Sequence, residues 1–222
     1  MRLLAFEAGA GGCSAAVFDG DRPPCLRRLE GPGQGDALIP LLDAVLAEEG
    51  VAKNALGALA VCVGPGGFTG IRVAVAAAKG LGLVLGLPAF PVTTLAATAC
   101  AARGAAGSFP RLVAVDAGRG TIAVQPFGAD LSPDGPMTVT TPGGLAGRPD
   151  PLRPLVFRDG LPPDLALHPP PLVVAVDARH VGRAALAAGG TPAPTFDLKP
   201  LYLRPADARP SAGRPLVDRG AL

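Results

Sequence analysis

The chain has 222 residues with 20 basic and 18 acidic side chains, which gives a net charge of +2 at neutral pH. Its 49% hydrophobic content excludes an intrinsically disordered chain, although it contains 31 glycines and 26 prolines. The near-neutral charge argues against strong nucleic-acid binding by this chain alone.

Membrane and secretory segments are not expected. Charged residues, glycines and a proline interrupt the longest apolar stretch, residues 71–90, so it does not read as a membrane span. The first apolar run is too short for a signal peptide, and we expect a cytoplasmic protein. The four cysteines contain no C-x-x-C pair, which predicts reduced thiols. His168 and His180 lack metal-ligand spacing, so we expect no metal site.

The first half of the chain predicts the element order βββαβαβα. Short glycine-containing turns between the first three strands are typical of an antiparallel meander. The fourth strand is a continuous apolar run, as in a strand buried on both faces. Thr93 or Thr94 is the expected cap of the last helix. The expected strands are 2–7, 13–18, 24–30, 59–63 and 89–92. The expected helices are 36–49, about 71–86, and one that runs from the Thr93 or Thr94 cap to about residue 102.

From about residue 104 the same order begins again in shortened form. The segment 141–154 has no helical period and predicts a loop where the first half has a helix. Asp177 is the expected cap of a final helix that runs to about residue 188. The expected strands are 111–116, 121–127, 137–140, 155–158 and 172–176. The order predicts an α/β protein with the actin-like ATPase (ribonuclease-H-like) fold, made of two similar halves, 1–105 and 106–222, with the second shortened.

The most informative segment is a glycine-rich loop between an apolar strand and a helix of small residues. Thr69 is a candidate to accept hydrogen bonds from the free N–H groups of that helix, and such a helix start can bind an anion. The loop lacks the Gly-Lys-Ser/Thr ending of a Walker A motif. We therefore interpret it as a structural elbow that orients the helix. The run is Gly64-Pro65-Gly66-Gly67-Phe68-Thr69-Gly70-Ile71-Arg72.

An ATPase of this fold needs an acid on its first strand to organise Mg²⁺ and a second glycine-containing turn opposite. Glu7 could supply the acid, and Asp116 with Gly118 could form the turn. Each also fits a structural role, as an acid at a strand end and as residues of a hairpin turn. No convincing general base is present. We treat Glu7, Asp116 and Gly118 as a vestigial nucleotide site and expect no catalysis by this chain alone.

The helix after the loop has almost no polar face. Ala76 with Gly80, and Ala78 with Gly82 and Gly86, place small residues four positions apart, so another backbone could pack closely. A helix that is apolar all round is either buried in its own core or completed by a partner. The sequence alone leaves both readings open.

Three stretches resemble the TsaB family: Leu38-Ile39-Pro40-Leu41-Leu42, the loop, and Pro91-Val92-Thr93-Thr94-Leu95. Two further landmarks are the turn 116–120 and the run Pro200-Leu201-Tyr202-Leu203-Arg204. The chain departs from the family pattern in three places. Gly67 replaces a serine, Glu7-Ala8 replaces Asp-Thr, and Gln34 replaces a histidine. The last two departures lead away from metal or phosphate chemistry.

The resemblance implies a non-catalytic subunit of the bacterial machinery that makes threonylcarbamoyladenosine beside the tRNA anticodon. Its partner would be TsaD, which carries the metal and the transferase site, assisted by the ATPase TsaE. No cofactor is expected on this chain alone, and tRNA would be met only through the complex. Self-pairing in isolation stays open. The family pairs through helices of the first half, which implies interface residues Leu38, Leu41, Leu42, Val45, Ala76, Lys79, Gly80 and Leu83.

Two other functions remain as alternatives. The first is a stand-alone actin-like ATPase or kinase that uses Glu7, the loop 64–72 and the Asp116 turn. The second is a peptidase, because relatives have been described as glycoprotease-like. The missing metal-ligand spacing argues against the peptidase.

Overall fold

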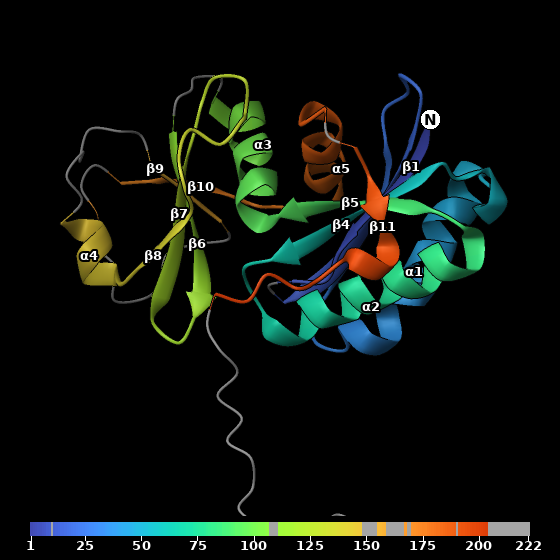
Figure 1. The fold of residues 1–222 in the computed structure, drawn as a ribbon, viewed down its shortest axis with the longest axis horizontal. Coiled ribbons are helices and arrows are strands. Elements are labelled where there is room, and N and C mark those ends of the chain that lie inside the picture. The colour runs from blue at the N-terminus through green and yellow to red at the C-terminus, as the bar shows by residue number, and fades with distance from the viewer. Residues whose placement is uncertain are drawn as a thin grey trace, which may run out of the picture.

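Two mixed β-sheets stand side by side in this computed structural model, with helices between them and on their outer faces (Figure 1). This layering follows from strands that are apolar on both faces and need a cover on each side. The structure describes residues 1–9, 11–106, 111–147, 155–158, 167, 170–189 and 191–203.

The first sheet has the strand order β11-β5-β4-β1-β2-β3. Its meander β1-β2-β3 is antiparallel, and β4 and β5 run parallel to β1. The expected strands are therefore confirmed, with ends that differ by at most one residue. The bounds are β1 Arg2–Glu7, β2 Gly12–Asp19, β3 Cys25–Glu30, β4 Ala58–Gly64, β5 Pro88–Thr93 and β11 Ala193–Pro194.

The second sheet repeats this arrangement in the order β10-β9-β6-β7-β8. Strands β6, β7 and β8 form an antiparallel meander, while β9 and β10 run parallel to β6. The repeated order confirms the predicted α/β actin-like fold with a shortened second copy. The bounds are β6 Arg111–Gly118, β7 Thr121–Phe127, β8 Thr138–Thr140, β9 Leu155–Arg158 and β10 Leu172–Val174.

Helices cover the sheets unequally. Two long helices pack on the outer face of the first sheet, two lie between the sheets, and a five-residue helix covers the second sheet. In that order they are α1 Gln34–Glu49, α2 Phe68–Leu85, α3 Thr94–Ala106, α5 Ala178–Ala187 and α4 Pro142–Ala146, with 3-10 turns η1 Lys53–Ala55 and η2 Thr195–Asp197.

Two helix caps were predicted correctly and one loop was not. The backbone N–H of Ala96 donates to Thr93 Oγ1 at 3.1 Å, and Asp177 caps α5. The segment expected as a loop at 141–154 begins with the short helix α4, because Thr141 Oγ1 accepts a hydrogen bond from the Gly144 N–H at 3.2 Å. Residues 148–154 of that prediction lie outside the described residues.

Strand β4 joins the two main cores. Leu59, Val61 and Val63 pack towards α1 and α2, while its alternate residues, including Ala60 and Cys62, pack towards α3 and α5. All seven residues of the strand are buried. The prediction of a strand buried on both faces is confirmed, and α2 is thereby fixed on one side of the sheet.

The end of the described chain returns to the first sheet. Strand β11 pairs with β5, and the backbone N–H of Leu201 donates to the Val63 carbonyl at 2.7 Å. Helix α5 also packs against this sheet. The segment 191–203 therefore contacts elements of the first half, and the proposed division into 1–105 and 106–222 remains a prediction.

Candidate functional site

The glycine-rich loop makes a short connection from β4 to α2. Gly64 has a φ of +107°, which favours glycine, and its peptide bond to Pro65 is cis. The helix begins at Phe68, earlier than expected, with Gly67 at the N-cap and no side-chain capping bond. The predicted Thr69 cap is therefore wrong, because Thr69 already lies inside the first turn of the helix.

Segments of the same chain pack against both sides of this connection. A Cβ atom added at Gly70 would collide with the Ala8 carbonyl oxygen, so α2 starts directly against the end of β1. On the other side, a Cβ at Gly64 would lie 3.3 Å from the Leu201 carbonyl oxygen. These close approaches support the interpretation of the loop as an elbow that sets the position of α2.

Helix α2 has two faces with different surroundings. Its inward face packs into the first core, and a Cβ atom at Gly82 on this face would collide with the Thr195 side chain. Its outward residues are exposed, with Leu83 and Val84 exposed at 85% and 81%. We call these outward residues the outer stripe, and they are Phe68, Arg72, Ala76, Gly80, Leu83 and Val84.

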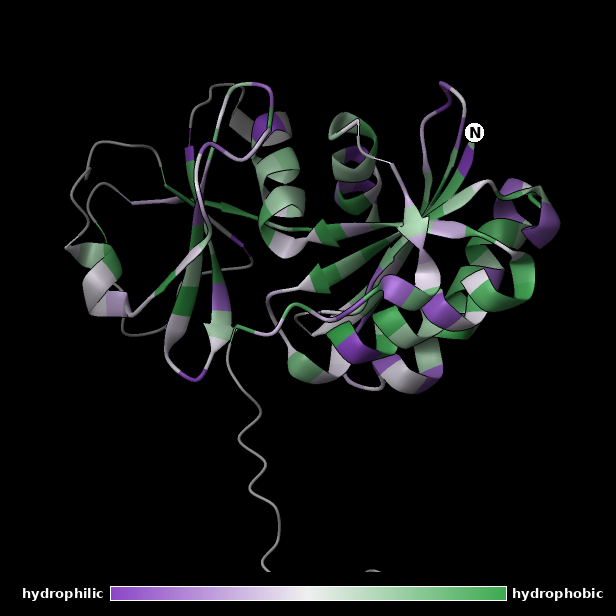
Figure 2. Ribbon diagram, viewed as in Figure 1, coloured by the Kyte–Doolittle hydropathy of each residue, from purple (hydrophilic) through white to green (hydrophobic). Residues whose placement is uncertain are grey.

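The apolar composition of α2 follows from this arrangement. Hydrophobic residues dominate its ribbon in Figure 2, and by length and composition the helix would qualify as a membrane span. Its inward face, however, belongs to the first core with Ile71, Ala74 and Ala78. Packing explains that face without a membrane and leaves the outer stripe as the more exposed side of the helix.

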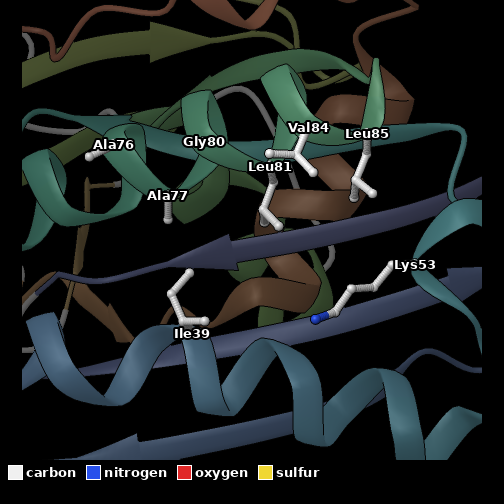
Figure 3. Close-up of a pocket in the computed structure, with 8 residues that line it drawn as sticks. All are labelled: Ile39, Lys53, Ala76, Ala77, Gly80, Leu81, Val84 and Leu85. Carbon is white, nitrogen blue, oxygen red and sulfur yellow. The ribbon is translucent and has the colours of Figure 1, made fainter.

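A groove with a volume of about 450 Å³ runs between α1 and α2. Figure 3 shows Leu81 and Leu85 pointing from α2 towards α1, where Ile39 faces them. Lys53 lines the same groove and its Nζ lies 2.7 Å from the Asp43 Oδ1 of α1. The groove is therefore apolar, with an ion pair at its edge.

The predicted interface residues separate into two groups. Ala76, Gly80 and Leu83 are exposed and Lys79 is half-buried, so α2 presents its four predicted residues to solvent at least in part. The four from α1 are corrected, because their helical spacing turns them into the first core and leaves at most 5% of each exposed. These are Leu38, Leu41, Leu42 and Val45.

Sequence reasoning missed a cluster at the start of the outer stripe. The Arg72 guanidinium carbon lies 3.7 Å from the centroid of the Phe68 ring and 5.4 Å from that of Tyr202. Arg72 Nε donates a hydrogen bond of 2.7 Å to the Tyr202 hydroxyl. The landmark run 200–204 was visible in the sequence, but a contact across 130 positions was not.

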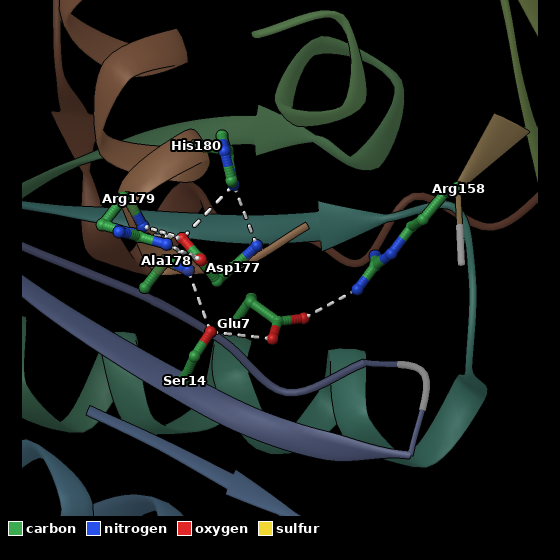
Figure 4. A network of polar contacts seen from close by, with 7 residues as sticks. All are labelled: Glu7, Ser14, Arg158, Asp177, Ala178, Arg179 and His180. Carbon is green, nitrogen blue, oxygen red and sulfur yellow. Dashed lines mark hydrogen bonds and ion pairs between the residues drawn. The ribbon is translucent and has the colours of Figure 1, made fainter. Parts of the chain in front are cut away.

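A buried polar network connects the two sheets at the end of β1 (Figure 4). The Ser14 hydroxyl donates to Glu7 Oε1 at 2.9 Å, and Arg158 Nη2 donates to Glu7 Oε2 at 3.1 Å. The side chains of Glu7 and Arg158 are 8% and 9% exposed. Both carboxylate oxygens of Glu7 are therefore used within the chain, and the ion pair links β1 to β9.

The network continues to the start of α5. The Ala178 N–H donates to Ser14 Oγ at 2.9 Å, and the preceding residue, Asp177, forms a capping box with His180. Burial acts to raise the pKa of Asp177, but the contacts of its carboxylate with His180 and Arg179 outweigh it and hold that pKa well below its usual range. The carboxylate thus stabilises the fold at neutral pH, and this contribution is lost as the pH falls through its lowered pKa.

The three residues of the predicted nucleotide site serve different contacts. Asp116 Oδ1 accepts a hydrogen bond of 2.7 Å from the Gly118 N–H inside its own turn. Glu7 instead pairs with Arg158, so a cation already neutralises the position that a metal-binding acid would occupy. Residues arranged this way do not fit a magnesium site. Within the described residues there is no group of three side chains of the kind that holds a metal.

Comparisons with known proteins give several matches to this chain. Residues 35–130 match the family model of TsaD, tRNA N6-adenosine threonylcarbamoyltransferase. The chain is 34% identical over 102 residues to the tRNA threonylcarbamoyladenosine biosynthesis protein TsaB of Haemophilus influenzae. This aligned region covers 46% of this chain and 43% of that protein. It is 32% identical over 185 residues to an uncharacterized protein of Mycobacterium bovis, covering 83% and 81% of the two chains.

A solved structure extends the likeness to the whole fold. A Pseudomonas aeruginosa protein described as similar to the peptidase YeaZ superposes with a TM-score of 0.76 at 25% identity, over 91% of this chain and 99% of that one. The chain belongs to the TsaB/YeaZ family. Its match to the Haemophilus TsaB spans under half of that relative's length. Within this family pattern, Gly67 and Glu7 are the departures that the structure explains locally, as an uncapped helix start and an internal ion pair.

Proposed function

We propose that this chain is a non-catalytic subunit that pairs with TsaD and stabilises it for threonylcarbamoyl transfer to the adenosine 3′ of the tRNA anticodon. The outer stripe of α2 carries this proposal. It combines a flat centre, formed by the small residues Ala76 and Gly80, with the large exposed apolar side chains of Leu83 and Val84. Such a surface marks an interaction site. The family relation to proteins of threonylcarbamoyladenosine biosynthesis supports the identity of the partner.

The absence of catalysis is part of the same proposal. The acid at the end of β1 is paired with Arg158 and Ser14, so it is engaged in joining the sheets rather than open to a metal ion. We propose that ATP and the metal belong to the partner subunits and that TsaE completes the assembly. The chain would work in the cytoplasm and meet tRNA only as part of the complex.

Blocking the flat centre of the outer stripe tests the pairing. Gly80→Leu puts a large side chain where a partner backbone would approach, and co-purification with TsaD of the same organism should be lost. Ala187→Leu is the control, because it places the same leucine side chain at an exposed position of α5. Both variants should keep the wild-type circular dichroism spectrum. Unchanged pairing of the Gly80 variant would refute this interface, and light scattering of the isolated chain would show whether a second copy uses the same face.

The competing ATPase or kinase function predicts a different binding result. Calorimetry of the isolated chain with Mg-ATP should give no heat of binding on our proposal, whereas micromolar affinity would favour the alternative. A reconstituted reaction containing TsaD, TsaE and tRNA completes the test. Omission of this chain should stop tRNA modification, and modification that continues without it would contradict the proposed role.

A further inference from the structure

Arg72 is held in one position on an exposed surface. Its guanidinium stacks on Phe68, and its Nε hydrogen bonds to the Tyr202 hydroxyl. Phe68 and Tyr202 are themselves 58% and 49% exposed, so the cluster lies at the surface rather than in a core. Among the described residues Arg72 forms no ion pair with an acid, and its terminal nitrogens keep their donors for another group.

We propose that Arg72 is the receptor for a carboxylate of the partner subunit, a glutamate or aspartate on the element that packs across α2. This inference rests on the proposed function, because it takes the outer stripe as the partner surface. A guanidinium with both terminal nitrogens available matches a carboxylate with two parallel hydrogen bonds. Stacking on an aromatic ring fixes its plane in advance and reduces the side-chain entropy that binding costs.

The position of Arg72 on α2 supports a contact with the same partner element. Phe68, Arg72, Ala76 and Gly80 follow one another at intervals of four, so they lie along one side of the helix. Arg72 stands eight residues before Gly80, about 12 Å along the axis. A partner helix that crosses at the flat centre would reach Arg72 within two to three of its own turns.

Charge on the helix points to an acidic partner. The α2 sequence contains Arg72 and Lys79 and no acidic residue, and within the described part of the chain neither cation has an ion-pair partner. An apolar surface with two separated cations is suited to a protein face with matching acids. Nucleic acid is the less favoured occupant, because binding to its backbone needs several phosphate contacts together.

Affinity measurements on matched variants test the proposal. We would measure the dissociation constant for TsaD by calorimetry with wild type, Arg72→Met, Arg72→Lys and Arg22→Met. Arg72→Met should weaken pairing by about tenfold or more and reduce its salt dependence. Arg72→Lys should recover part of the affinity, since it keeps the charge but not the planar fork. Arg22→Met removes an exposed cation that pairs with Glu49 elsewhere and should have no effect.

Charge reversal adds a rescue test. Arg72→Glu should abolish pairing, and one Glu→Arg or Asp→Arg change in TsaD should restore it. Failure of every such change to restore pairing would overturn the proposal. The rescue also distinguishes a direct contact from a general loss of fold, which could not be repaired from the partner.

The outcomes separate this inference from the proposed function. If Gly80→Leu abolishes pairing and Arg72→Met does not, the interface stands and the carboxylate receptor is wrong. If neither variant affects pairing, the proposed function itself fails at this surface. Normal pairing by Arg72→Met together with weaker retention of tRNA by the complex would assign the guanidinium to RNA phosphate, and this too would overturn the proposal.

Discussion

The two faces of α2 carry similar small residues in different surroundings. On the inward face, Gly70 admits the Ala8 carbonyl and Gly82 admits the Thr195 side chain. On the outward face, a Cβ atom at Gly80 would meet no atom within 4 Å. Small residues four positions apart therefore do not by themselves show that another segment packs closely against the helix. The surroundings of each residue decide it. The inward set is already used by this chain, and on our proposal the outward set is left for a partner.

Gly70→Ala should give the largest effect, because the added methyl group would collide with a backbone carbonyl that cannot rotate away. We expect a loss of about 3 kcal/mol in the free energy of unfolding, at the upper end of the usual range for overpacking. Urea denaturation followed by circular dichroism measures it. An equally stable variant would show that the start of α2 can move away from β1.

Gly82→Ala should have a smaller effect of the same sign. Its methyl group would meet the Thr195 side chain, which can rotate or shift, so we expect a loss of about 1–2 kcal/mol. The double variant with Thr195→Ala should recover much of it, since the colliding atoms are removed. A coupling energy near zero in this double-mutant cycle would contradict direct packing between the two residues.

The sequence predicted most of the fold because local patterns decide it. The continuous apolar run of β4, the glycine turns of the first meander and the Asp177 cap each indicated their element correctly. The helical spacing of α1 also identified its buried side, yet Leu38 and Val45 were assigned to a partner when they pack in this chain's own core. Helical periodicity shows which residues are buried, but it does not show whether the same chain or a partner buries them.

The site could be predicted only in part because its contacts are distant in sequence. Glu7 was chosen as an acid at a strand end, but its pairing with Arg158 spans 151 positions. The two faces of α2 could not be told apart because the helix is apolar all round and its inward cover includes Thr195, far along the chain. Thr69 was wrongly predicted as the N-cap because the apolar pattern suggested a start at residue 71, whereas the helix begins at Phe68.

Gly80→Ala is the outward counterpart of the inward substitutions. Alanine favours a helix interior over glycine by up to about 1 kcal/mol, and nothing obstructs its methyl group. The isolated chain should therefore become more stable, by about 0.5–1 kcal/mol. Thermal unfolding measures this gain, and a loss of stability would mean that the chain itself covers the outer stripe.

Gly67→Ser should give the smallest effect. It changes the elbow, the loop that connects α2 to strand β4 of the first sheet. Gly67 is the N-cap of α2, its φ of −56° suits any residue, and a Cβ atom there would meet nothing within 4 Å. A serine hydroxyl could accept a hydrogen bond from a free N–H of the first turn, worth a few tenths of a kcal/mol over glycine. A small rise in melting temperature with unchanged affinity for TsaD is expected. Weaker pairing would instead show that the loop itself contacts the partner, and the elbow would then belong to the interface as well as to the fold.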